Sequence, residues 1–262
     1  MTIDTDMHGH VSRSSALQMA VAAQQKGLRV LGLSEHVFQM QETRPALQHL
    51  EPEGPLLTFH TYIADVSAAT TQSNVDVRLG LEVDFIPGMN ELIHAFIQEY
   101  SWDFLIGSVH QIGDLQFEAN YSWSREEGEA LWLQYFELLR RAVNSGYFSV
   151  VSHPVRLRVH NPYLPSTFDN ELEHLAAEAT RNDVALEMNG YDMLHYHSLV
   201  RRLTKACLMH HTPISVGSDA HYPGGIAQAH QQTENMLLES GMTKIRLWKQ
   251  MKPEDYFLKT FL

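Results

Sequence analysis

Histidine and carboxylate residues stand at regular positions along the chain, where they could bind metal ions. The stretch DMHGHVSRSS, residues 6–15, places His8 and His10 two positions apart. Residues with this spacing in an extended strand point to the same side, so the pair can bind one cation. Asp219 and His221 repeat the spacing in GSDAH near the other end of the chain. Both pairs are therefore candidate metal ligands.

The wider set shares one feature, because each member ends or follows a short run that is typical of a β-strand. Its members are His8, His10, His36, Glu82, His110, His153, Asp219 and His221. Taken singly, each has an ordinary explanation as a polar residue at the end of a strand. Taken together, six histidines and two acids at the same end of successive strands favour a metal centre. A carboxylate can bridge two cations, and the lack of thiolates favours an open site for Zn, Mn or Fe.

Strand-like and helix-like segments alternate along the chain. The expected strands cover residues 2–8, 28–36, 75–85, 104–110, 148–154, 184–189 and 213–221. Helical patterns lie between most of them, as over 15–27 and 170–183. This alternation predicts one α/β domain over residues 1–262, a parallel barrel-like sheet with helices outside, whose carboxyl-terminal strand ends meet at the active site. The irregular residues 38–56 are expected to cover one mouth of the barrel.

Composition excludes several classes of protein. The net charge of -12 makes nucleic-acid binding unlikely by charge alone. The single cysteine, Cys207, rules out an internal disulfide framework and fits a reducing compartment. Neither a secretory signal nor an apolar run long enough for a membrane span is evident. We therefore expect a cytoplasmic protein without membrane contacts, while its oligomeric state is left open.

Six short motifs occur in a characteristic order. They are DMHGH, LSEH, GLEVDF, IGSVH, SHP and GSDAH. Together, over about residues 4–222, they resemble the motifs of the polymerase and histidinol phosphatase (PHP) family, and GLEVDFIPG with FLIGSVHQIGD is most similar to its histidinol-phosphate phosphatase branch. The resemblance implies a distorted (β/α)7 TIM-like barrel that holds two or three divalent metal ions and hydrolyses phosphate esters.

The resemblance also implies how the ligands are shared among the ions. One ion would be held by His8, His10, Glu82 and Asp219, and a second by Glu82, His110 and His153. His36 and His221 would belong to a third site, and Asp6 would orient a ligand histidine.

Two departures from the family pattern matter. A further His or Asp usually follows the histidine pair, but this chain has VSRSSAL there, so its third site is short of one protein ligand. We therefore expect about two bound ions per chain rather than three. Glu35 stands where the family usually has aspartate, a change that is tolerated if this acid only orients His36.

The expected reaction is hydrolysis of a small phosphate monoester by a metal-activated hydroxide, without a phosphoenzyme. Glu82, Asp219 and His221 are the expected catalytic residues. Arg156 and Arg158 would lie on an extended segment and converge on the substrate phosphate.

Other assignments are open at this stage. Glu187 and Asn189 fit a supporting role at the metal centre and an ordinary polar strand end equally well. Asp84, Asp192 and Glu42 are candidates for recognising a cationic leaving group. Histidinol phosphate is the first substrate to consider. The alternatives are nucleotides, nucleic-acid ends or phosphotyrosine proteins as substrates, or a metal-binding protein without catalytic activity.

Overall fold

The computed structural model describes residues 3–116 and 122–258. Seven parallel strands form one sheet in the order β1-β2-β3-β4-β7-β8-β9. Their bounds are β1 Thr5–Asp6, β2 Val30–His36, β3 Asp76–Asp84, β4 Phe104–Ser108, β7 Val150–Val151, β8 Ala185–Asn189 and β9 Ile214–Gly217. The two edges of the sheet meet, because the Met7 amide donates to the Val216 carbonyl at 3.0 Å and Gly9 bridges Ala220. The predicted seven-stranded α/β barrel is confirmed.

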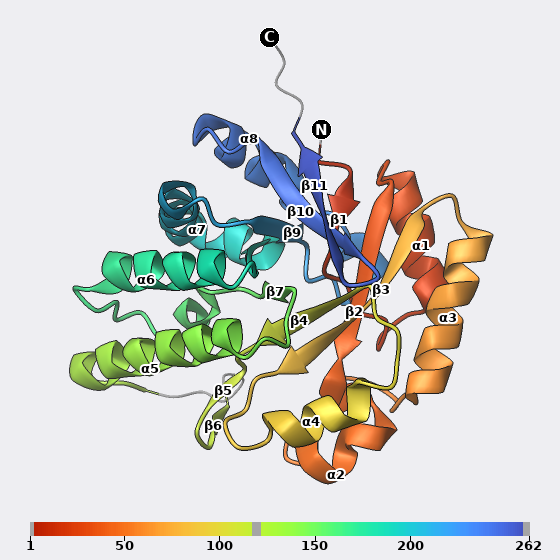
Figure 1. Cartoon of the computed structure of the whole chain (residues 1–262), viewed down its shortest axis with the longest axis horizontal. Coiled ribbons are helices and arrows are strands. Elements are labelled where there is room, and N and C mark those ends of the chain that lie inside the picture. Colours follow the sequence, from red (N-terminus) through yellow and green to blue (C-terminus); the bar gives the residue numbers. More distant parts are fainter. Residues whose placement is uncertain (1–2, 117–121, 259–262) are drawn as a thin grey trace.

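Helices surround the outside of the sheet (Figure 1). The α-helices are α1 Ala16–Gln25, α2 Arg44–Leu47, α3 Phe59–Gln72, α4 Asn90–Ile97, α5 Arg125–Asn144, α6 Phe168–Arg181, α7 Gly190–His210 and α8 His230–Glu239. Helix α1 begins where the sequence predicts, because the Ser15 hydroxyl accepts from the Gln18 amide while the Gln18 side chain accepts from the Ser15 amide. Helix α6 likewise corresponds to the helical pattern over 170–183.

The amino-terminal half of the barrel interior is filled by apolar side chains. Phe104 is completely buried there, and a Cβ atom added to Gly80 would lie 2.4 Å from its ring. A hairpin of β10 (Lys244–Lys249) and β11 (Lys252–Phe257) closes this end, and its Leu247 and Trp248 pack into the same cluster. The closed end leaves the carboxyl-terminal mouth as the place for chemistry.

Short irregular elements lie over the carboxyl-terminal mouth. They are the 3-10 helices η1 Val37–Gln39, η2 Gln41–Thr43, η3 Arg156–Val159 and η4 Pro223–Gly225, together with the short strands β5 Gln111–Ile112 and β6 Leu115–Gln116. Phe38, Leu50 and Glu53 line a cavity there together with candidate ligands, so the predicted covering role of residues 38–56 is confirmed.

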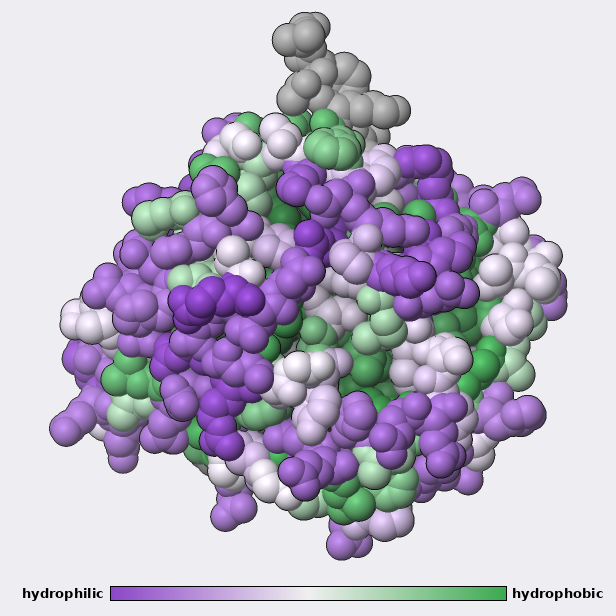
Figure 2. All heavy atoms as spheres, in the orientation of Figure 1, coloured by the Kyte–Doolittle hydropathy of each residue, from purple (hydrophilic) through white to green (hydrophobic). Residues whose placement is uncertain are grey.

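In the view of Figure 2, hydrophilic residues cover much of the surface and apolar residues form small separate patches. None of the helices in the described part of the chain has the length and apolar character needed to cross a bilayer.

Candidate active site

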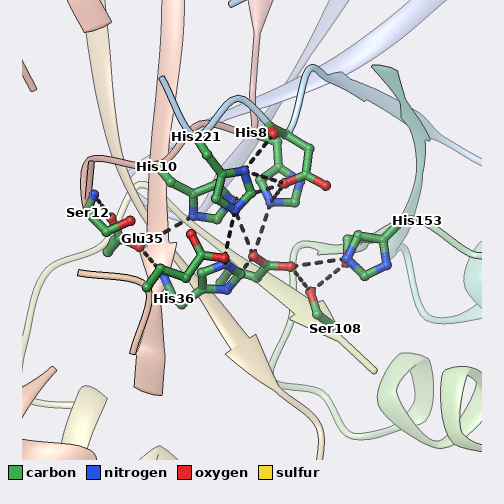
Figure 3. A network of polar contacts seen from close by, with 12 residues as sticks. His8, His10, Ser12, Glu35, His36, Ser108, His153 and His221 are labelled. Atoms are coloured by element: carbon green, nitrogen blue, oxygen red, sulfur yellow. Dashed lines mark hydrogen bonds and ion pairs between the residues drawn. The ribbon is translucent and has the colours of Figure 1, made fainter. Parts of the chain in front are cut away.

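The eight candidate ligands lie together at the carboxyl-terminal ends of the strands, as the sequence predicts. Figure 3 shows the labelled histidines of this group gathered around one centre from several parts of the chain. Glu82 lies at their centre, with its side chain 1% exposed. One of its carboxylate oxygens lies within 3.5 Å of a ring nitrogen in each of five histidines: His36 (2.9 Å), His153 (3.2 Å), His8 (3.3 Å), His10 (3.5 Å) and His110 (3.5 Å).

The two oxygens of Glu82 face different histidines. Oε2 lies near His8, His10 and His36, whereas Oε1 lies near His110 and His153. The Ser108 hydroxyl also donates to Oε1 at 2.5 Å and so fixes the carboxylate. A carboxylate with ligand-type nitrogens on both sides has the arrangement needed to bridge two cations.

Several buried atoms of this cluster have no hydrogen-bond partner among the described residues. They are His8 Nε2, His10 Nδ1, His36 Nδ1, His153 Nδ1 and Glu82 Oε2. Leaving buried polar atoms unsatisfied is costly, so a group of them in one place needs an explanation. His36 Nδ1 lies 2.9 Å from Glu82 Oε2, the distance of a close ion pair. Nitrogen and oxygen donors gathered in this way fit Zn, Mn or Fe.

Carboxylates behind the histidines fix the orientation of two rings. Glu187 lies 2.7 Å from His8 Nδ1, and Asp84 lies 2.7 Å from His110 Nδ1. In both rings the other nitrogen, Nε2, then faces Glu82, which is the arrangement that supports metal-binding histidines. Of the two interpretations of Glu187, the structure favours the supporting role. Asp6 contacts a candidate ligand through the backbone, because it accepts from the amides of His8 and Ser218.

Two candidate ligands have an uncommon backbone conformation. The φ angles are 32° at His153 and 58° at Asp219, in the left-handed region that non-glycine residues rarely adopt. Such conformations concentrate at functional sites, where the surrounding structure holds them.

The electrostatics of the centre are set by close packing of histidines and acids. Burial opposes protonation of His8, but Glu187, Glu82 and Asp219 outweigh it and raise its pKa well above the usual value. Burial favours the neutral form of Glu82, yet His36 and His8 hold its pKa well below the usual range. Burial and the nearby Arg156 lower the pKa of His153 to about 4, so its imidazole is neutral, as a metal ligand must be.

Arg156 reaches the site, whereas Arg158 does not. Arg156 donates to Asp192 at 2.7 Å and to Asp219 at 2.8 Å, and it lines the cavity beside the cluster. The expectation of an extended segment is wrong, because residues 156–159 form the 3-10 helix η3. The guanidinium of Arg158 lies over the Tyr196 ring, 5.5 Å from its centroid, and is not among the residues that line the cavity. The helical turn separates two side chains that an extended strand would align.

A cavity of about 220 Å³ opens beside the cluster. It is lined by His36, Phe38, Leu50, Glu51, Glu53, His110, Gln116, Arg156, Val159, His160, Tyr191, Asp219 and His221. The three acids expected to recognise a leaving group are not among them: Asp84 contacts His110, Asp192 contacts Arg156, and Glu42 accepts from the Phe59 amide.

Glu53 is a site residue that the sequence did not single out. Its Oε1 lies 3.3 Å from His221 Nε2 and 3.8 Å from His36 Nε2. The residue belongs to the irregular stretch 38–56, which has no strand pattern from which its position could be inferred. Glu51 is an equally acidic residue two positions away, so the sequence does not distinguish the two.

Known proteins resemble this chain in sequence and in fold. A probable histidinol-phosphatase from Deinococcus radiodurans is 29% identical over 241 residues, covering 86% of this chain and 86% of that protein. A probable histidinol-phosphatase from Schizosaccharomyces pombe is 23% identical over 143 residues, or 50% of this chain and 46% of that protein. The crystal structure of histidinol phosphate phosphatase from Lactococcus lactis, complexed with Zn, L-histidinol and phosphate, has a TM-score of 0.79 at 19% identity and covers 95% of this chain and 98% of that one.

The family model described as PHP domain matches residues 4–190, which is most of the chain and includes the first six candidate ligands in sequence. The match agrees with the motif order and with the seven-stranded barrel. The protein therefore belongs to the PHP domain family.

Proposed function

We propose that the protein is a metal-dependent phosphatase that hydrolyses small phosphate monoesters, with histidinol phosphate as the leading substrate. The position of Asp219 carries the proposal. Its Oδ1 lies 3.2 Å from His10 Nε2 in the ligand cluster, and its Oδ2 accepts from Arg156 at 2.8 Å. The Asp219 carboxylate thus connects the metal-binding groups to the Arg156 guanidinium, which can bind a phosphate.

The ligand sets follow the two sides of Glu82. His8, His10, Glu82 and Asp219 would hold one ion, and Glu82, His110 and His153 a second. His36 and His221 would contribute to a third. Divalent ions held by these residues would lower the pKa of coordinated water and neutralise phosphate charge. Zn, Mn and Fe all suit these donors.

Arg156 is suited to orient the phosphate group. Its side chain is 19% exposed and is held by Asp192 on one side and Asp219 on the other. The hydrogen bonds that it makes within the described chain use Nε and Nη2, which leaves Nη1 for a ligand. An arginine fixed in this way binds phosphate with little loss of side-chain freedom.

Histidinol phosphate is favoured as the substrate for two reasons. The relatives from Deinococcus radiodurans and Schizosaccharomyces pombe are both named probable histidinol-phosphatases. The cavity also carries the acid Glu51 beside Phe38 and Leu50, which suits a leaving group with an amine and an imidazole ring. This is the combination of acidic and apolar surface that such a cation needs.

A substrate panel tests the proposal. The purified protein would be loaded with Mn, Zn or Fe and assayed on histidinol phosphate, an aryl phosphate, nucleotides and single-stranded DNA, with His153→Ala as the control. We expect metal-dependent phosphate release from histidinol phosphate that the variant lacks. Turnover of nucleotides alone would move the substrate assignment, and bound metal without turnover of any phosphate ester would refute the enzymatic function.

A further inference from the structure

The predicted third metal site has two protein ligands, His36 and His221, and the segment after His10 supplies no third ligand. Ring nitrogens of His10, His36 and His221 lie within 4.8 Å of one another. His10 also faces the first site through Glu82 and Asp219. A third ion held only by His36 and His221 would lack the three protein ligands that open metal sites usually have.

We propose that Glu53 supplies the missing ligand and that the protein binds three ions, with the third held by His36, Glu53 and His221. This proposal rests on the proposed function, because it concerns the same metal centre. Glu53 Oε1 lies between the two rings, 3.3 Å from His221 Nε2 and 3.8 Å from His36 Nε2. Its side chain is 17% exposed, so it is withdrawn from bulk water.

The backbone around Glu53 is fixed by a buried glutamine. Gln39 is completely buried, and its side-chain oxygen accepts from the Glu53 amide at 2.9 Å. Its side-chain nitrogen donates to the carbonyls of Gly54 (3.0 Å) and Pro55 (2.7 Å). Three hydrogen bonds from one buried side chain hold three consecutive residues. A loop held in this way can present a ligand at a defined position.

The loop packs directly on the segment that lacks a ligand. A Cβ atom added to Gly54 would lie 2.5 Å from the Ser12 carbonyl oxygen, so the two backbones are in close contact. Among the described residues, the one charged contact of Glu53 outside the histidines is with Arg13 Nη2, 3.6 Å from its Oε2. Arg13 is 58% exposed, so this ion pair is weakly held and leaves Oε1 to the histidines. The loop that carries Glu53 thus lies beside the segment after His10.

Metal counting tests the proposal without relying on activity. The wild type, Glu53→Gln and Glu51→Gln would each be saturated with zinc and desalted, and bound zinc would be measured by mass spectrometry. Glutamine keeps the size of Glu53 and removes its charge, and Glu51 is the matched control because it is an exposed acid two residues away. We expect three ions in the wild type and in Glu51→Gln, and two in Glu53→Gln.

A second measurement covers the case in which the variant folds poorly. In crystals of the zinc-loaded wild type, anomalous scattering should show a third ion with a Glu53 oxygen at about 2.0–2.2 Å. Two ions in the wild type, three in Glu53→Gln, or a third ion without Glu53 would each overturn the proposal. Phosphatase activity of the wild type is measured separately, so its absence would refute the proposed function and not this ligand assignment.

Discussion

Glu187 offers the most direct test of how the metal centre is held. Its Oε1 lies 2.7 Å from His8 Nδ1, and its Oε2 accepts from the His153 amide at 2.9 Å and from Asn189 Nδ2 at 3.1 Å. In Glu187→Gln, one of these oxygens becomes an NH2 group. At least one of the three groups that donate to Glu187 then faces the NH2 group, which cannot accept a hydrogen bond.

The size of the effect follows from the type of bond that is lost. A buried hydrogen bond to a charged group contributes about 1.5–3 kcal/mol, which corresponds to a change of about 10- to 150-fold in an equilibrium constant. Removal of a partner behind a metal-binding histidine typically costs about 10- to 100-fold in affinity or activity. We therefore expect the zinc affinity and kcat/KM of Glu187→Gln to fall by at least about tenfold.

Competition with a chelator measures the zinc affinity, and release of inorganic phosphate measures kcat/KM. Glu239→Gln is a suitable control, because Glu239 pairs with Arg201 on the surface. Thermal unfolding of the metal-free proteins shows whether both variants fold. Zinc affinity and activity of Glu187→Gln within twofold of wild type would refute the role of Glu187 in holding His8.

Three further changes test other parts of the structure. Arg156→Lys should reduce kcat/KM for phosphate esters about tenfold or more through loss of a charged hydrogen bond, whereas Arg158→Lys should change kcat/KM little. Steady-state kinetics measure both effects, and equal effects would contradict the placement of the two residues. Gly80→Ala should lower the free energy of unfolding by about 1–3 kcal/mol in denaturant titrations, because its Cβ would meet Phe104, and the loss should be smaller in a Phe104→Leu background. Burial raises the pKa of Cys207 to about 12, so the thiol ionises at lower pH in the unfolded chain, and the free energy of unfolding should fall as pH rises above about 9. At pH 8 the buried thiol of the native protein should resist an aromatic disulfide reagent. Rapid stoichiometric labelling would contradict its burial.

The placement of the eight candidate ligands could be predicted because it depends on strand order alone. In a parallel barrel, a residue at the carboxyl end of any strand comes to the same mouth. His36 ends β2, and Glu82 stands near the end of β3, so their proximity follows once both strands are recognised. Neither the loops nor the exact rotamers enter that inference.

Loop residues could not be predicted in the same way. Arg156 and Arg158 follow a strand of only two residues, and the sequence pattern is the same whether the next segment is extended or turns into η3. Glu53 lies 17 residues beyond His36 in sequence, and its position depends on hydrogen bonds from Gln39. Such contacts are tertiary and have no periodic signature in the sequence.

The two departures from the family pattern form one structural arrangement. Glu35 was expected to orient His36, and its Oε1 accepts from the His36 amide at 3.0 Å and lies 3.5 Å from His10 Nδ1. Its Oε2 also accepts from the amides of Val11 and Ser12 at 2.7 and 2.6 Å. An aspartate at this position would be one methylene shorter, so the longer side chain helps to reach the segment after β1. Glu35 thereby fixes the backbone of Ser12, on which Gly54 packs. The longer acid in LSEH and the small residues after His10 thus both support the loop that brings Glu53 to His36 and His221.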